Sequence, residues 1–129
     1  MRCPGCSKAI FRKEADKRQG ICPDCDFHFY VSAKTRVEQM LDAGTFEECD
    51  AELMPADPLE FVDKKPYAKR LVSEQARTGL SDAALTGTGM IRARRVAVGI
   101  TDSAFIMGSM GSVVGERLTR LIELSLIHI

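Results

Sequence analysis

The chain has 129 residues, of which 45% are hydrophobic and 28% are charged, close to the proportions of an ordinary globular domain. Lys and Arg number 18, as do Asp and Glu, so the formal net charge is zero and nucleic-acid binding through bulk positive charge is not favoured. No apolar stretch approaches the roughly 20 residues of a membrane-spanning helix, and the N-terminus carries no apolar signal segment. These features predict a soluble, cytoplasmic protein that does not associate with membranes.

Four of the five cysteines form two Cys-x2-Cys pairs with fifteen residues between the pairs: Cys3, Cys6, Cys22 and Cys25. An odd cysteine count without an export signal argues against a disulfide framework. Two tight turns of this kind can direct four thiolates to one centre, the tetrahedral arrangement that Zn²⁺ accepts. Because four thiolates leave no ligand position for water, we expect one structural zinc ion and no catalytic metal. Iron or a redox-active cysteine pair is the less favoured alternative.

Two further residues are weaker candidates as metal ligands. Cys49 has no partner cysteine, and we expect it to be a small buried hydrophobic residue. His28 lies three residues after Cys25 and could bind a metal or stack on a base, but an exposed position on the module surface is favoured. Basic residues cluster between the two cysteine pairs, at Arg12, Lys13, Lys17 and Arg18.

Helical signals follow the cysteine module. Ser32 is a good N-cap for a helix that runs to about Ala43 and is ended by Gly44. Residues 45–66 contain three prolines and a concentration of acidic residues, which predicts a connecting segment with little regular structure.

A second helix is predicted to begin at Pro66 and to end near Gly79. We expect its apolar residues to face inward: Tyr67, Leu71 and Val72.

The hydrophobic period then changes from 3.6 to 2. Residues 85–91 and 95–101 predict two strands around a short turn at 92–94, with Val96, Val98 and Ile100 on one face. Residues 113–123 return to helical spacing, with the apolar positions Val114, Leu118, Leu121 and Ile122. The second half of the chain is therefore predicted to be β-β-α.

The turn Gly108-Ser-Met-Gly-Ser112 leads into this last helix. Glycines and helix N-terminal N–H groups can approach an anion, but the turn matches neither common nucleotide-binding motif. From the residues alone, a tight connection is the favoured interpretation. Asp102, at a strand end, stands where catalytic groups often lie, and a turn-capping role fits it equally well.

Four motifs in order resemble one known family: Cys3-Pro-Gly-Cys6; Cys22-Pro-Asp-Cys25 with His28-Phe29; Asp57-Pro-Leu-Glu-Phe61; and Met107-Gly-Ser-Met-Gly-Ser-Val-Val-Gly-Glu116. So arranged, they resemble the N-terminal part of the β subunits of bacterial acetyl-CoA carboxylase carboxyltransferase, over residues 3–123. The last of the four motifs is far more specific than the cysteine spacing, which many zinc ribbons share.

The resemblance implies an α+β fold in which a four-cysteine zinc ribbon is followed by the first β-β-α unit of a crotonase-like domain. The corresponding segments are the ribbon at 1–31, a helical linker at 32–83 and an incomplete crotonase-like domain at 84–129. The implied reaction transfers the carboxyl group from carboxybiotin to acetyl-CoA and gives malonyl-CoA for fatty-acid biosynthesis. In this family, backbone N–H groups stabilise the enolate and the biotin oxyanion as charge develops.

The resemblance also implies cofactors and partners. The cofactors are one structural Zn²⁺, held by Cys3, Cys6, Cys22 and Cys25, and carboxybiotin on a carrier protein. The partners are a carboxyltransferase α subunit in a heterotetramer of two α and two β subunits, the biotin carboxyl carrier protein and biotin carboxylase, with ATP binding by the complex. Tentative substrate-binding residues are Gly108, Ser109, Gly111 and Ser112.

The sequence departs from the family pattern at several positions. Asp26 stands where members usually have Gly, and Cys49 where Leu is common. The family's Ser-Gly-Gly-Ala-Arg oxyanion motif does not occur in the chain, so we expect no catalytic residue within it. Residues 124–129 do not resemble the family's continuation. We therefore expect a truncated chain that is inactive alone.

A different class of function remains open. A stand-alone zinc-ribbon module could bind nucleic acid or a protein partner, since basic residues lie beside Phe11, Phe27, Phe29 and Tyr30. Nucleic-acid binding is possible but not favoured, because residues 37–66 carry nine acidic residues against two basic ones.

Overall fold

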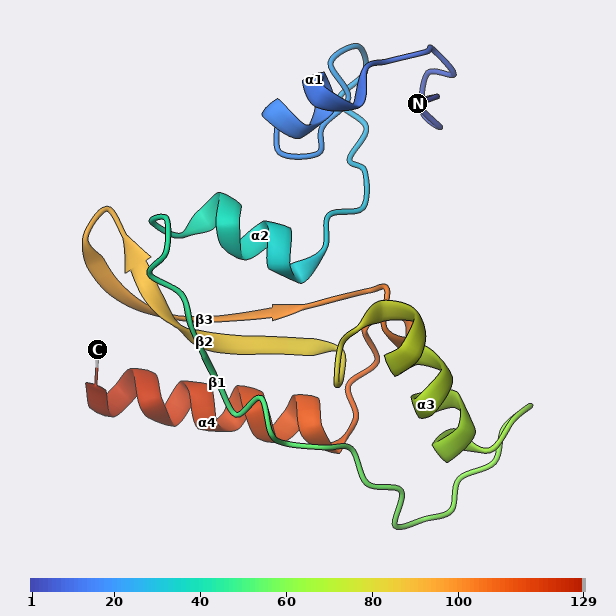
Figure 1. Ribbon diagram of the computed structural model, residues 1–129, viewed down its shortest axis with the longest axis vertical. Helices are drawn as coiled ribbons and strands as arrows, with labels where there is room; N and C mark the ends of the chain where they lie inside the picture. The colour runs from blue at the N-terminus through green and yellow to red at the C-terminus, as the bar shows by residue number, and fades with distance from the viewer. Residues whose placement is uncertain (129) are drawn as a thin grey trace.

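A computed structural model describes residues 1–128 and shows a small N-terminal module joined by one connecting segment to a larger α/β unit (Figure 1). Ile129, the last residue of the predicted 84–129 domain, lies outside the described residues. The elements in chain order are α1 (Arg12–Lys17), α2 (Ala33–Met40), β1 (Glu47–Cys49), α3 (Tyr67–Thr78), β2 (Ala84–Ile91), β3 (Arg94–Thr101), the 3₁₀ turn η1 (Ile106–Gly108) and α4 (Ser112–His128).

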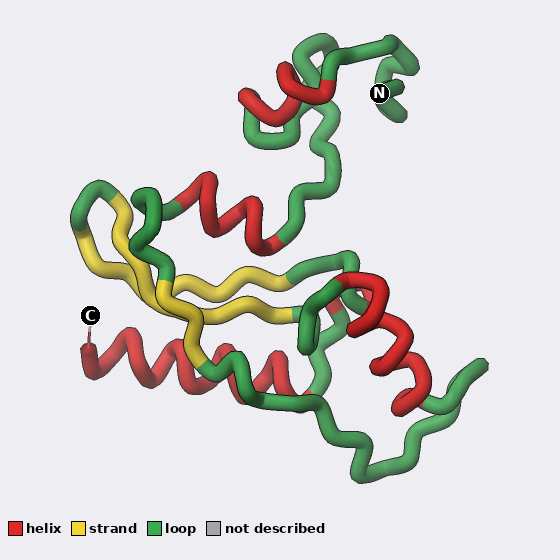
Figure 2. Tube along the Cα trace, viewed as in Figure 1, coloured by secondary structure: helices red, strands yellow, loops and turns green. Residues whose placement is uncertain are grey.

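The larger unit is an antiparallel sheet in the order β1-β2-β3, with α2 on one face and α4 on the other (Figures 1 and 2). On the α2 face, Val37 and Leu41 pack against Leu85 and Val98. On the α4 side, buried Val114 joins a second cluster with residues from α3, from the start of β2 and from the segment after β3. The predicted β-β-α order is confirmed.

The hairpin between β2 and β3 turns through Arg92 and Ala93, which both have positive φ, at 50° and 61°. A two-residue turn of this hand matches the twist of the strands that it joins. The Asp42 carboxylate accepts hydrogen bonds from the N–H groups of both residues, at 3.0 and 2.7 Å. The turn thus lies within the predicted residues 92–94, and a side chain fifty residues earlier holds it.

The predicted helix starts are confirmed, and two of the three predicted helix ends are wrong. The Ser32 hydroxyl accepts a hydrogen bond from the Thr35 N–H at 3.2 Å, as an N-cap should. The helix ends at Met40 and not near Ala43, because Leu41 is extended and the Asp42 N–H donates to the Met90 carbonyl on β2. Helix α3 ends as predicted, with Gly79 in the left-handed region at φ 69°.

One apolar side chain does not face inward as predicted. Val72 in α3 is 67% exposed. It follows directly after the buried Leu71, and neighbours in a helix point about 100° apart. Helix α4 also continues five residues past the predicted end. No helix in residues 1–128 is both long and apolar enough to cross a membrane.

Two short elements were not predicted. Strand β1 lies in the segment expected to be irregular, and it pairs with Thr86–Thr88 of β2. Its first two residues are exposed glutamates, so the sequence shows no alternation of buried and exposed side chains. Helix α1 occupies the basic stretch between the cysteine pairs and buries only Ala15.

A buried arginine, Arg117 of α4, ties β1 and the segment after it to the unit. Its side chain is 1% exposed, and its guanidinium donates to four carbonyls and to the Ser81 hydroxyl. The four carbonyls belong to Asp50, Ala51, Leu53 and Ala84. Backbone dipoles therefore balance a positive charge that water does not reach.

Candidate functional site

The two Cys-x2-Cys pairs form turns of the same geometry. In the first, the Ser7 N–H donates to the Cys3 carbonyl at 2.8 Å, and in the second the Asp26 N–H donates to the Cys22 carbonyl at 3.1 Å. Ser7 and Asp26 both have positive φ, 59° and 57°. Asp26, which departs from the family pattern, adopts this backbone because Asp tolerates the left-handed region better than most residues.

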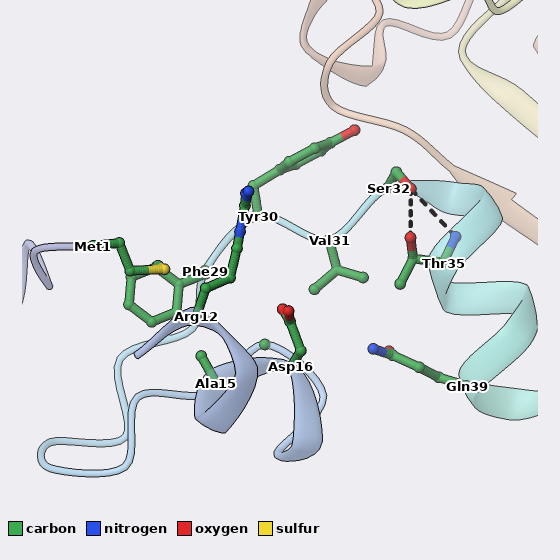
Figure 3. A pocket seen from close by; sticks show the side chains of 11 residues that line it. Met1, Arg12, Ala15, Asp16, Phe29, Tyr30, Val31, Ser32, Thr35 and Gln39 are labelled. Carbon is green, nitrogen blue, oxygen red and sulfur yellow. Dashed lines mark hydrogen bonds between the residues drawn. The ribbon is translucent and has the colours of Figure 1, made fainter. Parts of the chain in front are cut away.

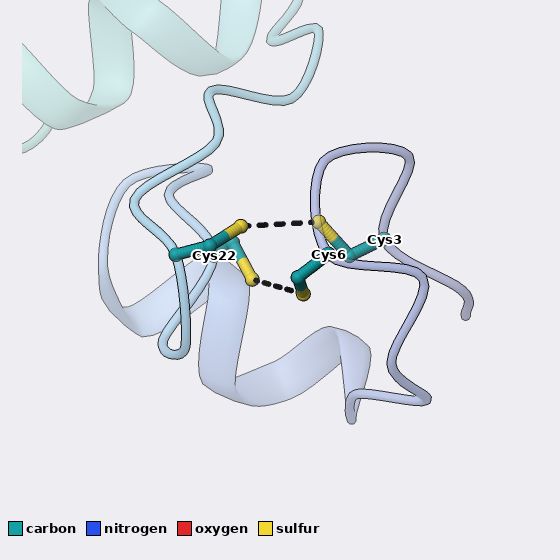
Figure 4. A group of neighbouring side chains, drawn as sticks. Cys3, Cys6 and Cys22 are labelled. Atoms are coloured by element: carbon teal, nitrogen blue, oxygen red, sulfur yellow. Dashed lines mark hydrogen bonds between the residues drawn. The ribbon is translucent and has the colours of Figure 1, made fainter.

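These turns bring the four predicted thiols together. The Sγ atoms of Cys3, Cys6, Cys22 and Cys25 all lie within 4.8 Å of one another (Figure 4). The Cys3–Cys25 and Cys6–Cys22 sulfur pairs are 3.6 and 4.0 Å apart, far beyond a disulfide bond, and all the cysteines are free. Tetrahedral Zn²⁺ with bonds of about 2.3 Å requires sulfurs about 3.8 Å apart. The cluster could therefore hold a metal ion.

The local environment gives the clustered thiols different proton affinities. Burial by itself raises the pKa of Cys3, but N–H groups of Cys6 and Gly5 and the neighbouring thiols lower it to about 7. At Cys25 the Phe27 N–H lowers the pKa, whereas burial and hydrogen bonds with the other thiols raise it to about 12. A cation that takes thiolate ligands must displace these protons, so its affinity should increase with pH.

The cluster sits in a small core of its own. Cys3 and Cys22 are 1% and 0% exposed and pack with Ile10, Ala15 and Phe29. The Arg18 guanidinium bonds the Cys22 carbonyl and the Asp26 carboxylate, each at 3.0 Å, and so braces the second turn.

The other candidate ligands lie elsewhere. His28 is exposed and does not belong to the group of sulfur ligands that the described residues form. Cys49 lies on β1 and is half-buried, less than expected. Its burial and the nearby carboxylates raise the pKa of its thiol, which keeps it protonated.

The predicted glycine turn lies at a second site, between β3 and α4. Met107 and Gly108 have positive φ, 58° and 74°, and the Gly108 N–H donates to the Phe105 carbonyl at 2.8 Å. The first α-helical bond of α4 joins the Gly115 N–H to the Gly111 carbonyl at 3.1 Å. The turn thus passes directly into a helix N-terminus, where N–H groups can stabilise negative charge.

The tentative substrate residues differ in exposure. Ser109 and Ser112 are exposed, and Gly108 and Gly111 are half-buried. A Cβ at Gly111 would come within 3.4 Å of the Tyr67 hydroxyl, so α3 limits the space behind the turn.

Asp102 lies at the base of this turn and connects three parts of the chain. Its carboxylate accepts hydrogen bonds from the Tyr30 hydroxyl at 2.6 Å, the Ala33 N–H at 2.8 Å and the Ala104 N–H at 2.9 Å. Burial raises its pKa, but these three donors outweigh burial and the pKa is lowered. The turn-capping prediction is confirmed, whereas the bonds to Tyr30 and Ala33 were not foreseen.

A cavity of 480 Å³ separates the cysteine module from α2 (Figure 3). Arg12 and Asp16 line it from α1, Phe29 and Tyr30 from the C-terminal end of the module, and Gln39 from α2. Sequence spacing gave no signal of this cavity, because its walls come from elements that pack only in three dimensions.

Comparison with curated proteins identifies close relatives. A protein of Rhodopirellula baltica named acetyl-coenzyme A carboxylase carboxyl transferase subunit beta is 67% identical over 95% of this chain. Proteins of the same name from Synechococcus sp. and Trichodesmium erythraeum are 47% and 46% identical over 95% of it. The chain spans only 39%, 39% and 38% of these relatives, and no protein-family profile matches it.

Solved structures agree on the fold. The crystal structure of transcarboxylase 12S with hydrolysed methylmalonyl-coenzyme A bound aligns with a TM-score of 0.58 and 20% identity, over 90% of this chain and 19% of that one. A second structure of the same protein gives the same TM-score. The chain is thus homologous to part of the named β subunits, and its fold is that of a four-cysteine module followed by a crotonase-like β-β-α unit.

Proposed function

We propose that the protein to which this chain corresponds transfers a carboxyl group from carboxybiotin to acetyl-CoA and so makes malonyl-CoA for fatty-acid biosynthesis in the cytoplasm. The observation that carries the proposal is the 67% identity over 95% of the chain to a carboxyltransferase β subunit. The chain spans only part of its relatives' length, so we propose this activity for the assembled enzyme and not for the chain alone.

Within that enzyme, we assign one structural Zn²⁺ to Cys3, Cys6, Cys22 and Cys25. The support is the fit of the two sulfur–sulfur distances, 3.6 and 4.0 Å, to a tetrahedral thiolate site. All four ligands come from the protein, so the ion would leave no open position for a reacting group. The module 1–31 would then be a structural unit with its own core, and segment 32–83 would cover and extend the domain that begins at 84.

We assign Gly108, Ser109, Gly111 and Ser112 to the substrate site. Backbone N–H groups at the start of α4 are suited to a group on which negative charge develops, and the glycines permit close approach. Carboxybiotin supplies the activated carboxyl group, and the residues of this chain would orient the thioester that receives it. No described side chain of the turn is an acid or base, which fits a site that works by backbone electrostatics.

The proposed partners are an α subunit in a heterotetramer of two α and two β subunits, the biotin carboxyl carrier protein and biotin carboxylase. We assign ATP binding to the complex and not to this chain, whose glycine turn matches neither nucleotide-binding motif.

The experiment that tests the function is a chimera. The 122 aligned residues of this chain replace their counterparts in the Rhodopirellula baltica subunit, and malonyl-CoA formation is measured with the cognate α subunit. We expect activity within a few-fold of the parent subunit. A chimera that assembles with the α subunit and yet makes no malonyl-CoA would contradict the proposal.

Two variants of that chimera test the turn. Gly111→Val places side-chain atoms against the Tyr67 hydroxyl and should lower kcat/KM by about 100-fold, the scale of losing one oxyanion donor. Ser109→Ala, an exposed position, should lower it less than threefold. Small and equal effects would show that the turn is only a connection.

The alternative is a nucleic-acid-binding module. Phe11 is 77% exposed beside Arg12 and Lys13, an arrangement suited to binding single-stranded nucleic acid. Two other basic side chains already pair with carboxylates: Arg18 with Asp26, and Lys8 with Asp24 at 3.9 Å. Salt-dependent binding to an oligonucleotide that is lost in Lys13→Ala would favour this alternative.

A further inference from the structure

The buried Asp102 carboxylate joins segments that lie far apart in the sequence. It is 3% exposed, and its three donors belong to the exit of the cysteine module, the start of α2 and the turn after β3. The Tyr30 hydroxyl reaches it across 72 residues of sequence. A local cap of the turn needs only the Ala104 N–H, so the other two bonds call for a further explanation.

On the module side, Tyr30 is attached to the second cysteine turn. The Phe27 carbonyl accepts from the Cys22 N–H, and the Phe29 N–H donates to the Gly20 carbonyl, both at 2.8 Å. The rings of Phe27 and Phe29 stack edge to face with centroids 5.3 Å apart, and Phe29 packs against the cysteine core. The backbone at Tyr30 is therefore positioned by the geometry of the cysteine cluster.

On the turn side, Ala104 is held from two directions. Its N–H donates to Asp102, and its carbonyl accepts a hydrogen bond from Arg77 of α3. The next residue, Phe105, is 1% exposed in the α3–α4 core, and its carbonyl accepts from the Gly108 N–H. A movement of Asp102 would therefore be transmitted to the start of the glycine turn.

We propose that Asp102 is a positioning residue through which the four-cysteine module sets the conformation of the turn Ile106–Gly108. This gives the module a task at the segment assigned above to the substrate, and it extends that proposed function. The Tyr30 hydroxyl is the link on which the coupling depends, because it carries the direct contact between the module exit and the turn. The Ala33 N–H anchors the same carboxylate to α2 and keeps it oriented.

The test measures hydrogen exchange of the Gly108 and Ser109 amides by NMR in the 129-residue chain. In Tyr30→Phe, both amides should exchange about tenfold faster than in the unchanged chain, as expected for loss of one bond to a charged group. Amides of the β2–β3 ladder, such as that of Val98, should change less than threefold, which separates a local effect from global unfolding. Tyr30 is 58% exposed, so Phe at this position leaves no buried gap.

Two further variants make the test specific. Ser32→Ala removes the N-cap of α2 on the same connecting segment but no bond to Asp102, and it should leave Gly108 exchange unchanged. Cys22→Ser disrupts the module and should accelerate Gly108 and Ser109 as much as Tyr30→Phe does. The double variant should be no faster than either single one, because both act through one link.

Three outcomes would overturn the proposal: unchanged Gly108 exchange in Tyr30→Phe, the same acceleration in Ser32→Ala, or additive effects of Tyr30→Phe and Cys22→Ser. Zinc content is measured on the same samples. A chain that folds without zinc would contradict the metal assignment, while the comparison of Tyr30→Phe with Cys22→Ser would still decide the coupling.

Discussion

The cysteine module and the larger α/β unit are stabilised by different means. The module, residues 1–31, has a buried core of four side chains, two of which are the thiols Cys3 and Cys22. The unit, residues 32–128, has two apolar clusters on opposite sides of a sheet and a buried arginine between its layers. A core of four residues cannot offset the conformational entropy of 31, so the module needs an ion where the unit can rely on packing.

The largest expected effect concerns the module. Cys22→Ser removes a fully buried ligand, and loss of the ion should forfeit most of the apparent binding free energy of about 10 kcal/mol that folds such modules. Metal analysis should find no stoichiometric zinc, and amides of residues 1–31 should lose protection. Cys49→Ser, on β1, is the matched control and should keep one zinc per chain. Equal zinc content in the two variants would mean that the cluster is not the metal site.

The next effect concerns the unit. Arg117→Met removes the hydrogen bonds from the buried guanidinium to four carbonyls and should lower the free energy of unfolding by about 3 kcal/mol. Arg120, one turn away from Glu116 in α4, forms only partly exposed ion pairs with Glu116 and Asp50, so Arg120→Met should cost much less than Arg117→Met. Urea denaturation followed by circular dichroism measures the free energy of unfolding of both variants. Similar losses in the two variants would show that the buried arginine has no special role.

A glycine pair tests whether β1 is an integral part of the unit. A Cβ at Gly87 would lie 2.3 Å from the Glu47 carbonyl oxygen, so Gly87→Ala should push β1 away and cost about 1–3 kcal/mol. Gly115 in α4 has open space at the same position, and Gly115→Ala should instead stabilise the helix by about 0.5–1 kcal/mol. The two variants should shift the denaturation midpoint in opposite directions. A neutral Gly87→Ala would indicate that β1 contributes nothing to stability.

The smallest effect is a pH dependence at the contact between the two regions. The pKa of Asp102 is lowered below its ordinary value of 3.8, so its stabilising contribution is present above pH 3.8 and is lost as the pH falls through the folded-state pKa. Asp102→Asn should cost about 1–2 kcal/mol at pH 7, and the difference from the unchanged chain should shrink near pH 3. Urea denaturation at the two pH values measures this. A difference that is the same at both would show that the carboxylate charge is not what stabilises the contact.

What could be predicted from the sequence followed from local chemistry. The cysteine spacing, the cap at Ser32, the left-handed Gly79 and the period-2 strands each depend on residues close in the chain, and the structure contains all of these features.

What could not be predicted depends on long-range contacts. Strand β1 exists because Glu47–Cys49 meet β2, not because of an alternating pattern of their own. The link from Tyr30 to Asp102 spans 72 residues, and the bonds from Arg117 to residues 50–53 span more than 60. A single sequence gives no signal for such pairs. The inward face of α3 was misjudged at Val72 for a related reason, because neighbouring elements decide which side of a helix is buried.

Residue-resolved amide exchange with and without a zinc chelator tests the difference between the two regions most directly. On metal removal, amides of residues 1–31 should lose at least tenfold in protection, while those of the β2–β3 ladder should change less than threefold. Outside the module, the Gly108 and Ser109 amides should be the ones that exchange faster when the metal is removed. Loss of protection in both regions together, or in neither, would contradict the account of a metal-dependent module joined to a unit stabilised by packing.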